Sequence, residues 1–395
     1  LAAKALSGRA NARLQAKDYA GATADVKAFL GRDTDATETA DAQFILGLAQ
    51  AGAKNYEAAI EAFKSIVERH PNYAGIDKVL FELAWTHKSA KNDDAAFDYF
   101  SRLAERHPNS SLAAESNYHV GEHLYHEKKD YVQAAAAYRA ALKSGKKSEL
   151  AEKAQHKLGW ALYQQNDFAG AGKAFADQLA DYPQGELTAD AAFMNAESLF
   201  KQAKYEAAYP AFSRALAMKP SSEEFVALGL LHAGQSAGQL KKWDESLRHL
   251  AELTGKHPES TYVPEALYEQ GWARHNQRKF AEALKLYEAA AEKAPTREVG
   301  ARARFMAGEV LFEQGNHKDA VRSFFQVAYG FSETGAPESI RIWQAASLYE
   351  SGRCFEVLKD LDQAKKLYAE LLEKYPKSDK AELAKRRLAE LTKQG

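Results

Sequence analysis

The feature that most constrains the fold of this 395-residue chain is an internal repeat. Five segments carry a small residue, an alanine 12 positions later, an aromatic residue 4 positions further on and a proline 8 positions after that. The five sets are Gly47/Ala59/Phe63/Pro71, Gly159/Ala171/Phe175/Pro183, Ala196/Ala208/Phe212/Pro220, Gly271/Ala283/Tyr287/Pro295 and Gly352/Ala364/Tyr368/Pro376. A period of this length is the signature of a stacked repeat array and not of one globular domain.

Weaker copies fill the gaps between these sets, so that the small residue recurs at positions 10, 47, 84, 121, 159, 196, 234, 271, 308 and 352. The copy at Gly121 carries one extra residue, and the final step is seven residues longer than the usual 37. The spacing predicts ten repeats over residues 1–378, an irregular joint near 331–338 and a C-terminal capping helix over 379–395. The cap is expected because its apolar residues form a single stripe with a polar back.

Each repeat has the pattern of two helices joined by a short turn. The small residue in the first helix allows the second helix to cross closely, and proline ends the second helix because it cannot continue it. Glycine, asparagine and aspartate mark the turn between the two helices, as in Asn166-Asp167 and Gly315-Asn316. The pattern therefore predicts an all-α fold, a right-handed α-solenoid of about ten helix-turn-helix units.

The charge balance and the cysteine count exclude several classes of protein and kinds of site. The chain has 53 Lys and Arg against 54 Asp and Glu, so it lacks the basic excess of nucleic-acid proteins and of polybasic membrane binders. Cys354 is the single cysteine, which excludes an internal disulfide and a thiolate zinc site. No run of 18 apolar residues is present that would span a membrane. Because the sequence begins Leu1-Ala2-Ala3, we expect a processed chain or a piece of a longer one.

The repeated set of small residue, alanine, aromatic residue and proline resembles the tetratricopeptide repeat family, whose usual unit has about 34 residues. The longer unit of this chain, with joints such as Pro258-Glu259-Ser260 and the run Leu158-Gly159-Trp160, is similar to bacterial cell-envelope members. These include the Tol-Pal-associated coordinator of envelope constriction and the outer-membrane assembly lipoprotein type, although the N-terminal cysteine of the lipoproteins is absent. The resemblance implies a periplasmic scaffold that binds a protein or peptide partner in a concave groove during envelope assembly or division.

With the small residue numbered as position 8 of each first helix, the resemblance places positions 2, 5, 9, 12 and 13 in that groove. Position 5 carries the aromatic residues Phe44, Phe81, Tyr118, Phe193, Tyr268, Phe305 and Tyr349. Position 12 carries Tyr125, Tyr163, Phe200 and Phe312, and position 9 carries Trp85, Trp160 and Trp272 together with Glu122, Glu197 and Glu309. We expect the tryptophans to anchor the partner and the glutamates to favour a partner with some positive charge.

The alternative for positions 5 and 12 is that their rings pack against the next first helix, because aromatic stripes at helical spacing are usually core. Some family members bind a C-terminal carboxylate through Lys or Arg at position 5 and Asn at position 9. None of the nine repeats from Gly47 onward has either residue type there, so that kind of binding is disfavoured.

One segment matches a catalytic motif. His119-Val120-Gly121-Glu122-His123 has the H-x-x-E-H spelling of a metalloprotease, and His126 follows. Since Gly121 is the small residue of its repeat, the segment is expected to be an ordinary helix. The sequence thus predicts a non-enzymatic protein with no catalytic residue, metal or cofactor. Two alternatives stay open: a cytoplasmic adaptor subunit that also buries its second-helix faces against partners, and a metal-binding or catalytic role at His119, His123 and His126.

Overall fold

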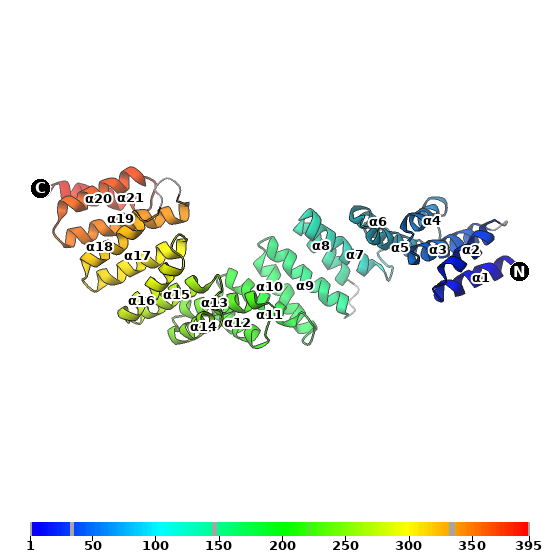
Figure 1. The fold of residues 1–395 in the computed structure, drawn as a ribbon, viewed down its shortest axis with the longest axis horizontal. Coiled ribbons are helices and arrows are strands. Elements are labelled where there is room, and N and C mark those ends of the chain that lie inside the picture. Colours follow the sequence, from blue (N-terminus) through cyan, green and yellow to red (C-terminus); the bar gives the residue numbers. More distant parts are fainter. Residues whose placement is uncertain (1, 32–34, 144–147, 221, 332–335, 394–395) are drawn as a thin grey trace. The chain divides into compact units, whose positions relative to one another are not determined.

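The computed structural model describes residues 2–31, 35–143, 148–220, 222–331 and 336–393. Throughout these ranges the regular structure is helical and no strand occurs, which confirms the predicted all-α class. The chain divides into two compact units, Leu1–Ala191 and Ala192–Gly395 (Figure 1). Within the described ranges no helix has the length and apolar character needed to cross a membrane. The predicted boundary at residue 378 stays a prediction.

The helices follow one another with short connections. The first unit holds α1 (Ala2–Gln15), α2 (Tyr19–Leu30), α3 (Ala36–Gly52), α4 (Tyr56–Arg69), α5 (Ile76–Ser89), α6 (Asp93–Arg106), α7 (Ala113–His123), the short π-helix η1 (Leu124–Lys128), α8 (Tyr131–Leu142), α9 (Glu149–Gln164) and α10 (Phe168–Asp181). The boundary between the units falls within α11 (Thr188–Lys201). The second unit continues with α12 (Tyr205–Ala217), α13 (Glu223–Gln239), α14 (Trp243–Lys256), α15 (Val263–Asn276), α16 (Phe280–Lys293), α17 (Glu298–Glu313), α18 (His317–Ala328), α19 (Glu338–Val357), α20 (Leu361–Lys374) and α21 (Ala381–Lys393).

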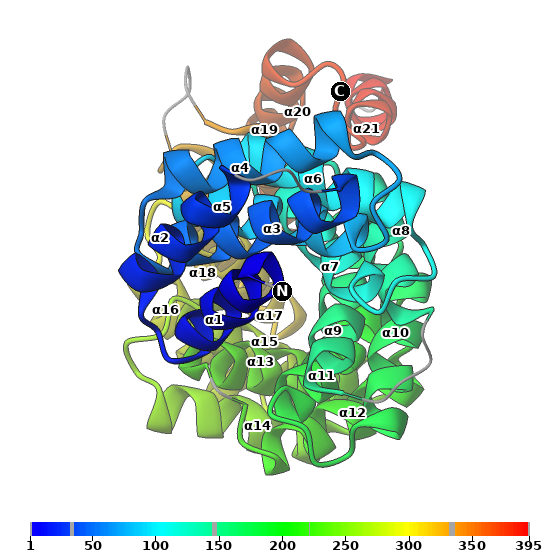
Figure 2. The ribbon, with the colours of Figure 1, turned by 90° about the vertical axis from the view of Figure 1, so that its right-hand side faces the viewer.

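Within each unit, consecutive helices pack on one another, from α1 to α10 and from α12 to α21, as α1, α2 and α3 do in Figure 2. The odd-numbered helices also pack on one another, α13 on α15 and α17 on α19 among them. We call the odd-numbered helix of each repeat helix A and the even-numbered one helix B. This packing of consecutive pairs is that of an α-solenoid, as the repeat predicted.

In six of the ten repeats, the core contains an aromatic ring of helix B that lies on a glycine of helix A. A Cβ atom placed on Gly121 would come within 2.6 Å of the Tyr138 ring, and one placed on Gly308 within 2.6 Å of the Phe324 ring. Both rings are fully buried. Because carbon atoms in contact lie about 3.5–4.0 Å apart, only a residue without a side chain fits beneath the ring at these positions. The repeated small residue therefore makes room for the aromatic residue that recurs with it.

The turn from helix A to helix B uses one residue with a positive φ. Glycine holds this place at Gly315, but lysine holds it at Lys17, Lys54, Lys91, Lys129, Lys241 and Lys359. The residue after it closes the end of helix A, since the Asn55 N–H donates to the carbonyl of Gln50 (2.8 Å). Aspartate or asparagine then caps helix B in several repeats, as where Asp130 accepts from the N–H of Gln133. The sequence predicted the Asp and Asn caps, but it did not predict that lysine would take the position with a positive φ.

The extra residue of the fourth repeat is absorbed by η1, which lies at the C-terminal end of its helix A. The hydrogen bonds of a π-helix span five residues instead of the four of an α-helix, so a π-helix takes up a one-residue insertion without shifting the rest of the repeat. Accordingly, Gly121 and the Tyr138 ring keep their contact although one more residue separates them.

The C-terminal end of the second unit contains the longest described helix, α19, of 20 residues. Residues 332–335 of the predicted irregular joint lie outside the described part of the chain. In α21, Ala381, Ala384 and Leu391 are buried against the preceding pair, as a capping stripe requires. The Arg387 guanidinium pairs with Glu356 of α19, so this residue of the predicted polar back ties the helix to its neighbour.

Candidate partner-binding surface

The aromatic rings at position 5 pack on the helix B ring of their own repeat. The ring centroids lie 5.8 Å apart for Phe44 and Phe63, 5.9 Å for Phe81 and Phe100, 6.0 Å for Tyr118 and Tyr138, 6.0 Å for Phe193 and Phe212, 5.7 Å for Tyr268 and Tyr287, 5.4 Å for Phe305 and Phe324, and 5.6 Å for Tyr349 and Tyr368. The packing alternative had named the next helix A as the partner of these rings. That contact occurs for Phe193, which also stacks on Phe225 of α13, and for Phe305, which also packs on Trp343 of α19 (5.2 Å), but the contact within the repeat is the general one.

Two of the position 5 residues do not fit the predicted role in partner binding. Phe193 is 1% exposed and Tyr268 is 8% exposed, so neither ring reaches a partner in this structure. Phe193 lies between two other rings, and the Tyr268 ring carries the Arg302 guanidinium 4.1 Å above its centre. Both are core residues. The other five position 5 rings are half-buried.

The rings at position 12 pack against the first residue of the following helix B. The pairs are Tyr125 with Tyr131 (5.2 Å), Tyr163 with Phe168 (5.2 Å), Phe200 with Tyr205 (5.7 Å) and Phe312 with His317 (4.9 Å), all edge to face. Each position 12 ring is half-buried and lies at the end of its repeat where the two helices meet. These four rings therefore combine a structural contact with an exposed edge.

Position 9 has one recurring neighbour, the residue at position 6 of the next helix A. We call this contact the 9–6 pair. It joins Trp85 to His119 (4.8 Å between ring centroids), Glu122 to Lys157 (3.1 Å), Glu197 to His232 (2.6 Å), Gln235 to Glu269 (3.0 Å), and Glu309 to Glu350 through their charges. Residues predicted to face a partner thus face the next repeat of their own unit.

The tryptophans are more involved in packing than the sequence indicated. Trp85 meets Phe81, Phe100 and His119 edge to face. The Trp160 indole N–H donates to Nε2 of His156 (3.0 Å). Trp272 packs on Trp243 (5.1 Å) and lies over Gly238, where a Cβ would come within 3.0 Å of its ring. All three are half-buried, so their predicted role as anchors stays a prediction.

The glutamates at position 9 form contacts inside the chain. Glu122 accepts a hydrogen bond from the Tyr138 hydroxyl (2.6 Å) and pairs with Lys157. Glu197 is 3% exposed and bonds to His232, so it is a buried joint residue and cannot select a partner as predicted. At Glu309, burial and the nearby Glu350 raise the pKa to about 7.

The three histidines of the H-x-x-E-H segment line one pocket of about 290 Å³, together with Lys88, Phe97 and Glu122 among others. Their rings have different neighbours, however. His119 Nδ1 lies 3.2 Å from Lys88 Nζ, His123 stacks on Phe97 (4.6 Å), and the exposed His126 lies 3.8 Å from Glu122. Burial, with the Lys88 charge, lowers the pKa of His119 to about 4. In the part of the chain that the structure describes, no three His, Cys, Asp or Glu residues are grouped to hold a metal.

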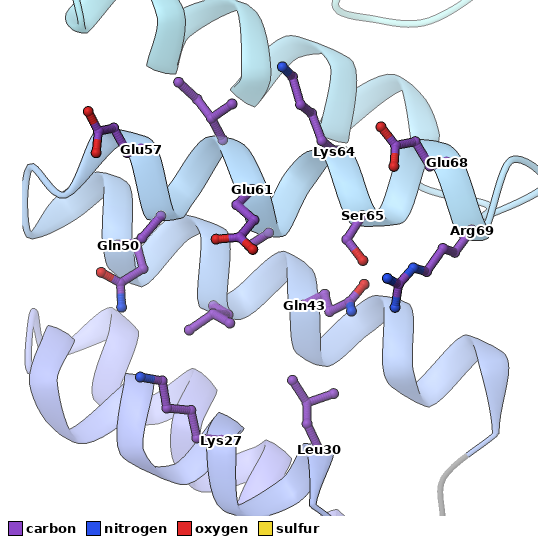
Figure 3. A pocket seen from close by; sticks show the side chains of 14 residues that line it. Lys27, Leu30, Gln43, Gln50, Glu57, Glu61, Lys64, Ser65, Glu68 and Arg69 are labelled. Carbon is purple, nitrogen blue, oxygen red and sulfur yellow. The ribbon is translucent and has the colours of Figure 1, made fainter.

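A second surface lies on the helix B side. In the first unit a groove of about 710 Å³ runs between α2 and α4 with α3 as its floor (Figure 3). Its walls carry both signs of charge, with Lys27, Glu57 and Glu61 among them, and Figure 3 shows Gln43, Ser65 and Arg69 close together at one end. A similar groove of about 540 Å³ lies over α17 in the second unit. The sequence analysis named the second-helix faces only as part of the adaptor alternative and did not identify these grooves, because a groove between helices of neighbouring repeats depends on how the repeats pack.

The comparisons with known proteins agree with this geometry. One tetratricopeptide repeat model matches residues 3–74, 156–223, 231–298 and 268–336, more than half of the chain, and a second matches residues 78–110 and 346–378. A search of curated proteins gave no match.

A search of solved structures returned matches to several chains. The apo form of RapI is 14% identical, with 95% of this chain and 98% of that chain covered and a TM-score of 0.44. The human IFIT1 dimer with m7Gppp-AAAA is 15% identical (97% and 86% covered, TM-score 0.41), and Pseudomonas aeruginosa PilF is 20% identical (58% and 96% covered, TM-score 0.38). At this level of similarity no function transfers from these proteins. The repeat matches, together with the helix pairs and the ring-on-glycine contacts, show that this chain belongs to the tetratricopeptide repeat family.

Proposed function

We propose that this chain is a non-enzymatic scaffold that binds a protein or peptide partner along the half-buried aromatic residues of its A helices. The observation that supports this most is the patch formed by Tyr125, Lys157, Trp160 and Tyr163 in the first unit. The Lys157 ammonium lies 5.7 Å from the centre of the Tyr125 ring, and Trp160 and Tyr163 lie 6.1 Å apart. Rings that are fixed by packing and still half-exposed lose little entropy on binding, and Trp and Tyr are enriched among interface hot spots.

The test compares two substitutions in the same unit. Tyr125→Ala combined with Tyr163→Ala removes two edges of the patch, whereas Val132→Ala changes a side chain that is 65% exposed on α8, a helix B. A partner is first captured from cell extract and purified, and its affinity for each variant is then measured by calorimetry. We expect the double variant to bind at least about 30-fold more weakly, since even one hot-spot side chain is worth about 2 kcal/mol, and the Val132 variant to bind as the wild type does. Equal affinity for all three proteins, with normal thermal melts, would contradict the proposal.

We also propose the periplasm of a bacterial cell as the compartment, with a role in envelope assembly or division. The support is the repeat of 37 residues and the joints of the Pro258-Glu259-Ser260 type. Fractionation of native cells, with N-terminal sequencing of the mature chain, tests this. Recovery of the protein in the cytosol with an unprocessed N-terminus would instead support the adaptor alternative.

The adaptor alternative is favoured by one specific observation, the groove between α2 and α4 in Figure 3. An adaptor that is buried on its helix B side would cover Lys27, Glu61 and Lys64. Binding that survives the Tyr125 and Tyr163 substitutions but is lost after Lys27→Glu and Glu61→Lys would move the partner from the helix A side to this groove.

A further inference from the structure

The joint between α17 and α19 differs in chemistry from the other 9–6 pairs. Four of the five pairs join complementary groups: an indole with an imidazole, a carboxylate with an ammonium, a carboxylate with an imidazole, and an amide with a carboxylate. The fifth brings two carboxyl groups together, Glu309 from α17 and Glu350 from α19. Both are largely enclosed, and Glu350 is 6% exposed.

The groups around Glu309 do not neutralise both acids. Arg353 of α19 is the nearest cation, but its Nη1 atom lies 2.5 Å from Oε2 of Glu350, and its guanidinium covers the Phe312 ring at 5.0 Å. Lys380, just before α21, also faces Glu309, although its ammonium lies over the Tyr349 ring at 5.8 Å.

Two further side chains lie near Glu309. Glu313, one turn along α17, is 3.2 Å from His275 of α15, and the Cys354 thiol lies close to both acids. Oε1 of Glu309 is enclosed and accepts no hydrogen bond from the described residues. A carboxylate in this setting gains from being protonated, because a buried charge without a hydrogen-bond partner is unfavourable.

We propose that Glu309, whose enclosed Oε1 atom accepts no hydrogen bond from the described residues, holds a proton at neutral pH, and that loss of this proton loosens the joint between the last two helix pairs of the second unit. The high pKa of Glu309, about 7 and caused by burial and then by Glu350, agrees with this geometry. The inference concerns the fold alone, so it stands or fails independently of the partner-binding proposal.

The sign of the effect follows from linkage. The folded pKa of Glu309 is about 7 and lies above the ordinary value of 4.5 for a free glutamate. The folded state therefore holds a proton that the unfolded state has released, and stability from this group falls as pH rises from about 4.5 through 7. With a pKa near 7, raising the pH from 6 to 8 should increase local opening about tenfold.

Hydrogen exchange on the full chain, read by mass spectrometry at pH 6 and pH 8 with labelling times corrected for intrinsic exchange, tests this. In the wild type, amides of α17 and α19 should lose about tenfold in protection between the two pH values, more than amides of α13 in the same unit. In Glu309→Gln, which carries no titratable group at this position, protection in α17 and α19 should stay constant. The matched control is Glu122→Gln, a position 9 carboxylate with a cationic partner, which should leave the change in α17 and α19 intact.

A second variant covers the case in which Glu309→Gln does not fold. Glu350→Gln removes the like charge, so Glu309 should ionise at lower pH and the change between pH 6 and pH 8 should shrink to less than threefold. The proposal is overturned if wild-type protection in α17 and α19 is the same at both pH values. It is equally overturned if a folded Glu309→Gln protein shows the full tenfold change.

Discussion

The 9–6 pair of the first unit, Trp85 with His119, and that of the second unit, Glu309 with Glu350, occupy the same place in the repeat. Both bury a titratable side chain between two A helices, and burial favours the neutral form of each. The pKa of His119 is consequently lowered to about 4 and that of Glu309 raised to about 7. The first joint should therefore weaken in acid and the second above neutral pH. The repeat decides which residues meet, and the residue types decide how the contact responds to pH.

The largest effect should come from what the two joints have in common, the ring on glycine. Gly121→Ala in the first unit and Gly308→Ala in the second each place a methyl group 2.6 Å from a buried ring. We expect each to lower the free energy of unfolding by about 2–3 kcal/mol, since a close-packed core has no room for the methyl group. Urea unfolding followed by circular dichroism measures this.

The control for the glycine variants is Gly255→Ala in α14, where a Cβ would have no neighbour within 4 Å. This change should stabilise the protein by about 0.5–1 kcal/mol, because alanine is the better helix former. If the three variants behave alike, the close approach at Gly121 and Gly308 is not what these positions require.

The next largest changes in stability should come from altering the charges of two 9–6 pairs. Lys157→Glu places a carboxylate opposite Glu122 and should destabilise the first unit by about 2 kcal/mol at pH 8, because a partly buried ion pair becomes a repulsive one. Glu350→Gln leaves one carboxylate, Glu309, beside the Arg353 guanidinium instead of two, and should stabilise the second unit by up to about 1 kcal/mol at the same pH. Unfolding at pH 8 in low salt gives both values. Opposite signs support the comparison, and equal signs break it.

The acid response of the first joint provides the third test. Because the folded pKa of His119 lies below that of a free histidine, its contribution is complete above pH 6.5 and is lost as the pH falls toward 4. As the pH falls over this range, the free energy of unfolding should decrease by about 2 kcal/mol less in His119→Gln than in the wild type. Thermal melts at pH 4.5 and pH 7 compare the two proteins. A wild-type loss that persists in full in the variant would assign it to other groups, such as the buried His87 and His156.

The smallest effect distinguishes two equivalent rings. The Tyr138 hydroxyl donates to Glu122, whereas the Tyr287 hydroxyl is buried with no hydrogen-bond partner among the described residues. Tyr138→Phe should cost about 1 kcal/mol, and Tyr287→Phe should be neutral or slightly stabilising, since it removes a buried polar group that forms no bond. Urea midpoints of the two variants give the comparison. A loss at Tyr287 equal to that at Tyr138 would show that its hydroxyl has a partner in solution.

The parts of the fold that could be predicted from sequence are those set within one repeat. Gly121 and Tyr138 recur together because the contact between them joins two adjacent helices, so the spacing alone reveals it. The contacts of the position 9 side chains could not be predicted in this way. Their neighbours, such as His232 for Glu197, lie some 35 residues away on the next A helix, and the angle between two helices does not show in a spacing. For the same reason the burial of Phe193 and Tyr268 became visible only in the packed repeats.

Turn chemistry was predicted only in part. Aspartate and asparagine are recognisable caps because their side chains accept from the backbone N–H groups. The lysines with positive φ, such as Lys54, leave no signal, since lysine is common on surfaces and rarely adopts this conformation.

The ring-on-glycine contact also bears on how the chain folds. In the second repeat it joins Gly47 to Phe63, only 16 residues apart, and the same short loop is closed in repeat after repeat. Chains dominated by such local contacts have low contact order and fold quickly, because little loop entropy is lost before a stabilising contact forms. Each helix pair can therefore serve as a starting point, and folding is expected to begin at whichever repeat closes first and spread to its neighbours.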